Sequence, residues 1–156
     1  MKNPVLFILS LFLLVPGCNM EPVDQNSKCL KEHERKELNK QMVTRFYQEL
    51  FGNKNIDIID KYVANEYIQH NPMAADGRQA LKDILRYWFA NAPKDTVDIR
   101  QVIADGDLVM LHVKSNIGGK PVAVVDIFRI EGDSIAEHWD VVQAIPDSAA
   151  NDHPMF

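Results

Sequence analysis

The sequence predicts an α+β domain in which amphipathic helices pack on one face of a curved antiparallel sheet. Three observations predict this class. Apolar residues recur at helical spacing over about residues 31–51 and 77–91. Four strand-like runs of about ten residues follow, beginning near residue 97. Gly-containing turns at 105–107, 118–119 and 131–133 separate these runs, which is typical of an antiparallel meander.

The composition is that of one soluble globular domain. The chain has 156 residues, of which 46% are hydrophobic and 25% are charged, and its formal net charge is −5. This acidic balance provides no positive surface for a phosphate backbone, so we expect no nucleic-acid partner.

The first seventeen residues have the pattern of an export signal. Lys2 supplies a positive charge, and the apolar run from Val5 to Val15 is too short to cross a bilayer as a helix. We therefore divide the chain into a signal peptide at residues 1–17, a polar tether at residues 18–30 and a folded domain at residues 31–156.

The segment Val15-Pro16-Gly17-Cys18 resembles the lipobox of bacterial lipoproteins. This resemblance implies cleavage before Cys18 and acylation of its thiol, which would anchor the protein at a membrane surface of a bacterial envelope. The alternative is a periplasmic or secreted protein in which Cys18 and Cys29 pair as a disulfide. Both alternatives predict an exported chain.

Three helices are expected at the start of the folded domain, followed by the strands. Gly52-Asn53 ends the first helix and Pro93 ends the third. Between the second and third helices, a brief extended segment ends at Asn71-Pro72, because the residue before a proline avoids the helical region. The helices are expected at about residues 31–51, 56–63 and 77–91, and the extended segment at residues 66–70. The strands are expected at residues 97–104, 108–117, 121–130 and 134–145.

Asp126 is the most informative residue of the strands. It shares a face with the apolar Val124 and Phe128, so its carboxylate is expected to be buried. A buried carboxylate must be paired, hydrogen-bonded or protonated, and such a group is suited to proton transfer at neutral pH. The alternative is a structural aspartate that is paired with Arg129, Arg100 or a backbone amide.

His112 is the expected partner of this carboxylate. Across a turn near Gly118-Gly119, His112 and Asp126 are expected to lie opposite one another on one face of the sheet. Residues so placed have Cβ atoms ~4.5–5.5 Å apart, which lets a histidine and an aspartate share a proton. The alternative for His112 is a core histidine that is bonded to a backbone carbonyl.

Further candidates follow from the extended segment and the last strand. His70 is expected at the rim of a pocket, where it would bind a substrate oxygen or cap the loop, and Tyr67 is expected in the same pocket. On the last strand, His138 and Asp140 share one face, whereas Trp139 lies on the other and is expected to pack. No histidine pair has the local spacing of a zinc or iron site, so we expect no metal and no cofactor.

Several motifs resemble one known family. They are Tyr67-Ile68-Gln69-His70-Asn71-Pro72, Val125–Ile130, Glu137–Gln143 and the closing His153–Phe156. Together with the order of elements, they resemble the SnoaL-like polyketide cyclase family of the nuclear transport factor two-like superfamily, over about residues 35–156. The resemblance implies that three helices wrap the sheet into a cone around an apolar pocket.

The resemblance also implies roles for individual residues. Asp126 would be the acid/base, and His112 would face the same pocket from the preceding strand. From their positions on the extended segment and the strands, and not from the resemblance, we also expect substrate-binding roles for His70, Tyr67, His138, Asp140, Trp139 and Phe128. We also expect a homodimer.

The sequence therefore predicts cofactor-free acid/base chemistry on a small, mainly apolar carbonyl compound. Asp126 would move the proton while His112, His70 and Tyr67 position the oxygen that gains negative charge. Isomerisation, aldol-type cyclisation and hydration would all use this arrangement. Two alternatives stay open: a non-catalytic module that binds an apolar ligand, and an interaction domain of the cell envelope that uses the exposed sheet face. Export argues against a literal polyketide cyclase, because polyketide assembly is cytoplasmic.

Overall fold

The helices lie where the apolar spacing predicts them, with shifted ends. The computed structural model describes residues 25–156, so the expected signal peptide and Cys18 lie outside the described residues. Residues 25–30, which we assigned to the tether, are helical because the first helix begins at Gln25. The helices are α1 (Gln25–Tyr47), the π-helix η1 (Gln48–Gly52), α2 (Ile58–Tyr62) and α3 (Arg78–Phe89). No helix within residues 25–156 is long and apolar enough to span a membrane.

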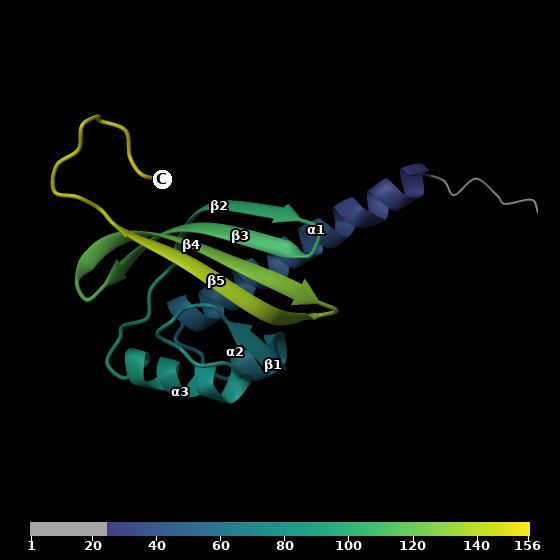
Figure 1. Cartoon of the computed structure of the whole chain (residues 1–156), viewed down its shortest axis with the longest axis horizontal. Coiled ribbons are helices and arrows are strands. Elements are labelled where there is room, and N and C mark those ends of the chain that lie inside the picture. Colours follow the sequence, from purple (N-terminus) through teal and green to yellow (C-terminus); the bar gives the residue numbers. More distant parts are fainter. Residues whose placement is uncertain (1–24) are drawn as a thin grey trace, which may run out of the picture.

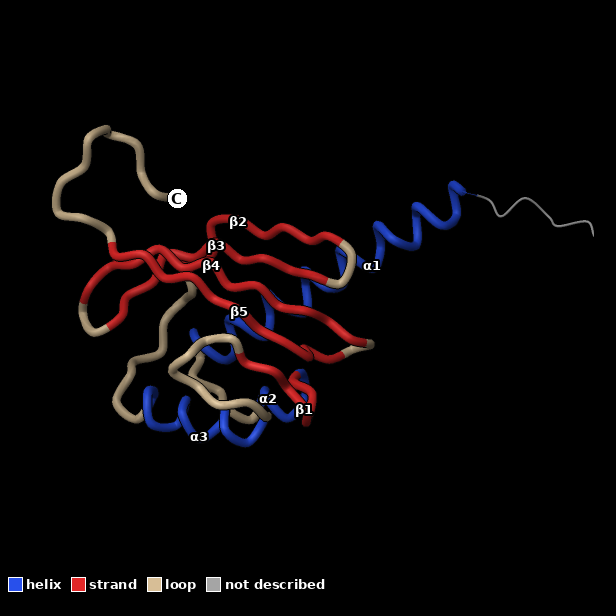
Figure 2. Tube along the Cα trace, in the orientation of Figure 1, coloured by secondary structure: helices blue, strands red, loops and turns tan. Residues whose placement is uncertain are grey.

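The sheet has five strands, and four of them form the expected meander. The strands are β1 (Val63–Gln69), β2 (Asp98–Asp105), β3 (Leu108–Ile117), β4 (Lys120–Glu131) and β5 (Ser134–Ala144). Their order is β1-β5-β4-β3-β2, and the pairs among β2 to β5 are antiparallel. The pairing of β1 is new, because β1 joins the edge of the sheet beside β5 in the parallel direction. Figure 2 shows β1 below the meander, next to β5.

One face of the curved sheet carries the helices, so the predicted α+β class is confirmed. The second half of α1 crosses this inner face, whereas its first half extends beyond the sheet (Figure 1). The core forms where alternate strand residues meet the apolar stripe of α1. Its fully buried members include Val43 and Leu50 from the first helical segments, Ile59 from α2, Leu85 from α3, Val109, Leu111 and Val113 from β3, and Ile135 from β5.

The turn between β3 and β4 sets the register of the inner face. It consists of two residues, Gly118 and Gly119, with φ values of +60° and +82°. Both residues have positive φ, as a two-residue hairpin turn of type I′ requires. The centre of the turn falls between the two glycines, so Asp126 lies opposite Leu111.

The expectation that His112 faces Asp126 is therefore wrong. The partner of His112 on β4 is Val125, whose side chain points to the outer face. Because strand side chains alternate, an error of one residue in the register moves a side chain to the opposite face of the sheet.

The parallel pair β1–β5 contains an irregularity that carries Gln69 to the inner face. Val63 pairs with Ile135, but Ile68 pairs with Glu137 and Gln69 with His138, so β1 bulges between these points. Directly after β1, the backbone N–H of His70 donates a 2.9 Å hydrogen bond to the carbonyl of His138.

Candidate functional site

Asp126 lies on β4 at the centre of the inner face, and only 4% of it is exposed. The Tyr47 hydroxyl on α1 donates to its Oδ2 over 2.9 Å, and Nε2 of His138 on β5 lies 3.0 Å from its Oδ1. The arginines considered as structural partners are engaged elsewhere: Arg129 with glutamates and Arg100 with Asp98. The carboxylate is thus held by a tyrosine and a histidine.

His138 occupies the place that we expected for His112. It lies on β5 opposite Phe128, and its ring stacks on the Phe128 ring with centroids 4.8 Å apart. Only 8% of His138 is exposed. Its second ring nitrogen, Nδ1, lies 3.0 Å from Oε1 of Gln69. Asp126 and His138 therefore form a buried pair with protein partners at both ends.

Asp140 and Tyr67 complete the polar cluster. Asp140 lies opposite Asp126 across β4 and β5, and it accepts a 2.6 Å hydrogen bond from the Asn71 side chain. Tyr67 is buried, and its hydroxyl accepts from Nε2 of Gln69 over 3.0 Å. Burial and the charges of the two aspartates raise the pKa of Tyr67 far above its ordinary value.

The pKa of Tyr47 is raised by the same two effects, burial and a nearby negative charge. Burial, followed by the charge and hydrogen bond of Asp126, raises the pKa of Tyr47 well above its ordinary value. Both tyrosines therefore stay protonated at neutral pH, and Tyr47 donates its hydroxyl hydrogen to Asp126.

Three of the expected site residues lie away from this cluster, on the outer face. The His112 ring lies against the Phe156 ring at 5.6 Å between centroids. His70 stacks on Trp139 at 4.5 Å, with 7° between the ring planes, and its Nε2 lies 2.7 Å from Oε1 of Glu137. Trp139 therefore packs against His70, and its role in substrate binding stays a prediction.

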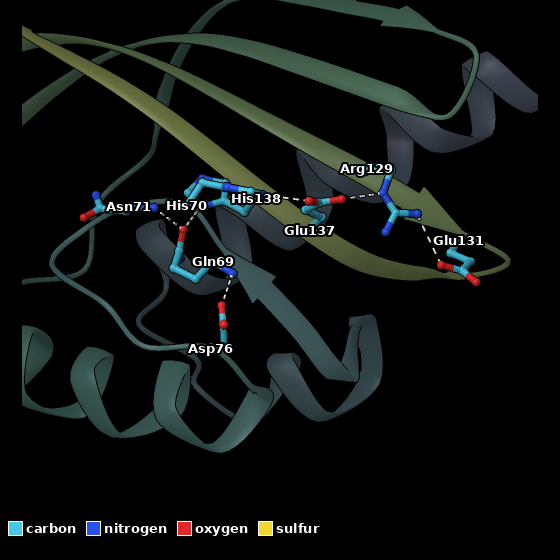
Figure 3. Close-up of polar contacts among 8 residues, drawn as sticks. All are labelled: Gln69, His70, Asn71, Asp76, Arg129, Glu131, Glu137 and His138. Carbon is cyan, nitrogen blue, oxygen red and sulfur yellow. Dashed lines mark hydrogen bonds and ion pairs between the residues drawn. The ribbon is translucent and has the colours of Figure 1, made fainter.

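Figure 3 shows the contacts of Glu137 on the outer face beside those of Gln69. Glu137 also accepts a 2.7 Å hydrogen bond from Arg129. The contacts with His70 and Arg129 together lower the pKa of Glu137. The consecutive residues Gln69 and His70 thus hold β1 to β5 on opposite faces, Gln69 through His138 and His70 through Glu137.

Asp126, His138 and Asp140 also have the chemistry of metal ligands. Their nearest ligand atoms lie within 4.8 Å of one another. In the structure these groups already hydrogen-bond to protein partners: the first two to each other, and Asp140 to Asn71. The absence of a metal from the working protein stays a prediction.

The inner face is more exposed at the end that carries Asp140 than at the Asp126–His138 pair itself. Two surface hollows, of about 420 and 410 Å³, lie elsewhere, beside the start of β5 and between α1 and β2, and neither is lined by Asp126 or His138. On the inner face, Asp140 is half-buried and the next residue on that face, Val142, is 47% exposed.

Tyr47 and Gln69 are the site residues that the sequence did not single out. Tyr47 belongs to the apolar stripe of the first helix, so it was expected to be buried. Because a buried tyrosine hydroxyl needs a hydrogen-bond partner, its position in the stripe could have marked it as a site residue. Gln69 precedes His70 within the Tyr67–Pro72 motif, but nothing local indicated that it would contact a strand near the end of the chain.

Comparison with known proteins finds a domain family and a fold. The family model for the SnoaL-like domain matches residues 43–138. No curated protein matches the sequence. One similar solved structure is a protein named as a candidate polyketide cyclase from Acidithiobacillus ferrooxidans, with 22% identity, a TM-score of 0.57, and coverage of 67% of this chain and 87% of that one.

Two further solved structures have the same fold. TsrD from Streptomyces laurentii is 20% identical, with a TM-score of 0.54 and coverage of 67% of this chain and 88% of that one. An NTF-2-like protein of unknown function from Burkholderia xenovorans is 12% identical, with a TM-score of 0.59 and coverage of 74% and 91%. At these identities the likeness shows the fold and leaves the reaction open.

Proposed function

Because the chain belongs to the SnoaL-like domain family, we propose that it is a cofactor-free enzyme that moves a proton next to the carbonyl group of a small neutral compound. The observation that supports this proposal is the buried Asp126–His138 pair, with 3.0 Å between Oδ1 and Nε2. A carboxyl group placed among apolar residues and bonded to a histidine is suited to general acid/base catalysis.

The proposed step begins with Asp126 as a carboxylate. Each of its oxygens has two lone pairs, and each makes one hydrogen bond, to Tyr47 or to His138, so a lone pair stays available for a substrate proton. The proton leaves the carbon beside the carbonyl for the carboxylate, and the electron pair of the C–H bond moves onto the carbonyl oxygen as an enolate. Return of the proton at another carbon completes an isomerisation. Alternatively, the enolate carbon attacks a second carbonyl, and Asp126 returns its proton to the resulting alkoxide oxygen, which completes an aldol-type closure.

The enolate oxygen needs a hydrogen-bond donor that does not itself lose its proton. Tyr67 meets this requirement, because its pKa is raised and its hydroxyl accepts a bond from Gln69, which leaves its own hydrogen for a ligand. A donor that is already oriented toward the developing charge lowers the barrier without reorganising in the step.

The proposal is tested by deuterium exchange. We expect the protein in heavy water to label the carbon beside the carbonyl in at least one member of a panel of neutral cyclic and linear ketones. The rate should exceed the buffer rate by about 10²-fold or more, the contribution typical of a positioned acid/base. Mass spectrometry of the recovered ketones measures the label. Ketones that bind without exchange would support a ligand-binding module instead.

We also propose that the chain is exported and lipidated at Cys18, which the Val15–Cys18 motif supports. The variant Cys18→Ser is expected to move the protein from the membrane fraction to the soluble fraction, because the acylated thiol is the attachment point. Fractionation followed by detection of the protein measures this. A wild-type protein that is already soluble would contradict the lipid anchor. The homodimer also stays a prediction.

A further inference from the structure

We infer that Gln69 is a positioning residue that keeps a proton on Nδ1 of His138 and thereby makes His138 Nε2 and Asp126 Oδ1 share a second proton. The inference rests on the proposed function only for its catalytic meaning. The hydrogen-bond pattern that carries it does not depend on any reaction.

The orientation of the Gln69 side-chain amide follows from its neighbours. The backbone N–H of Asn71 can only donate, and it lies 3.0 Å from Oε1 of Gln69, while Nε2 of Gln69 donates to the Tyr67 hydroxyl. If the amide were turned around, its NH₂ group would face the Asn71 N–H, donor against donor. Oε1 therefore points toward Asn71 and His138, as Figure 3 shows.

The position of the first proton on His138 follows next. An amide oxygen has no hydrogen to donate, so Nδ1 of His138, 3.0 Å from Oε1 of Gln69, must carry the hydrogen of that bond. The backbone N–H of Gln69 donates in turn to the Asp76 carboxylate over 2.7 Å, which anchors the start of the side chain.

A second proton must then lie between His138 and Asp126. With Nδ1 protonated, the neutral ring has only a lone pair at Nε2, and a carboxylate has only lone pairs at Oδ1. These atoms lie 3.0 Å apart in a buried site, where two facing lone pairs would repel each other. The pair is therefore an imidazolium with a carboxylate, or a neutral imidazole with a carboxylic acid.

The other titratable groups around the pair leave this arrangement in place. They come from three neighbouring elements: Tyr47 from α1, Tyr67 from β1 and Asp140 from β5. The two tyrosines keep their protons, and Asp140 is bonded to the Asn71 amide. Without Gln69, the neutral ring could place its single proton on Nε2 and bond to the Asp126 carboxylate, which would remove the shared proton from the pair.

The experiment is ¹⁵N NMR of the His138 ring in the full chain, recorded from neutral to alkaline pH. We expect a protonated Nδ1 in the wild type throughout the range in which the protein is folded. Gln69→Leu keeps the approximate size but removes the acceptor, so Nδ1 is expected to lose its proton while Nε2 keeps one. Gln69→Glu keeps an acceptor oxygen at the same position and is expected to retain the wild-type pattern.

The outcomes separate this inference from the proposed function. A wild-type Nδ1 without a proton overturns the inference. A folded Gln69→Leu variant in which the same ring nitrogens are protonated as in the wild type also overturns it. If that variant does not fold, the wild-type spectrum alone decides. If the ring behaves as expected but the wild type exchanges no ketone proton, the inference stands and the proposed function fails. If exchange occurs, Gln69→Leu should slow it about 10-fold or more and change its pH profile, whereas Gln69→Glu should restore most of the rate.

Discussion

Replacing Asp126 by asparagine is expected to stop proton transfer while the fold stays intact. The amide oxygen can accept the Tyr47 hydroxyl, and the amide NH₂ can donate to Nε2 of His138 when the ring proton is on Nδ1. An amide cannot take up the substrate proton, so the exchange rate is expected to fall by about 10²–10⁴-fold. Deuterium exchange with ketones measures the loss, and a thermal melt measures the fold.

Asp126→Leu is the matched control for this variant. Leucine has a similar size, but it leaves the Tyr47 hydroxyl and the His138 ring nitrogen buried without their partner. Each unsatisfied group is expected to cost about 1–3 kcal/mol in the free energy of unfolding. Wild-type exchange rates in Asp126→Asn would refute the role of this carboxyl group, and a leucine variant as stable as the wild type would refute the hydrogen-bonded site.

Leu111→Ala and His112→Ala are expected to differ strongly, although the two residues are adjacent in sequence. Leu111 lies opposite Asp126 on the inner face and is 0% exposed, so its truncation should cost about 2–5 kcal/mol through lost burial and the cavity left behind. His112 is half-buried on the outer face beside Phe156, where a substitution should cost about 1 kcal/mol or less. Urea unfolding of the full chain measures both.

The same pair of variants tests the register of the β3–β4 hairpin. Suppose that His112→Ala lowers the free energy of unfolding more than Leu111→Ala does and also stops the exchange of ketone protons. Then His112 faces Asp126, and the register of β3 against β4 described above is wrong. If His112→Ala leaves exchange near the wild-type rate, the catalytic partner of Asp126 is not His112. The test is sharp because alternate residues of a strand lie on opposite faces of the sheet.

The elements themselves were largely predictable from the sequence. The second expected strand, residues 108–117, has the bounds of β3. The third expected strand is one residue shorter than β4 at each end, and the fourth is one residue longer than β5 at its end. These boundaries are local, because turn residues such as Gly118-Gly119 and the alternation of side chains act between near neighbours. The start of α1 was missed, because the polar residues 25–30 have no apolar stripe that would reveal a helix.

The parallel pairing of β1 could not be predicted in this way. A short extended segment at residues 63–69 carries no local signal of its neighbour, and its partner β5 lies far along the chain. This pairing nevertheless brings Gln69 to His138. The contact between Gln69 Oε1 and the His138 ring therefore depends on a strand pairing that the sequence did not predict.

The sequence by itself determined the α+β class and the burial of Asp126, because apolar neighbours on one face of a strand predict where a side chain points. Only the tertiary structure decided which groups meet that carboxylate. Tyr47 reaches it through the packing of α1, which depends on contacts between distant segments, and His138 reaches it through the register of the β4–β5 hairpin. A difference of one residue in the register exchanged His112 for Leu111, because the two-residue turn between the strands is centred between its glycines.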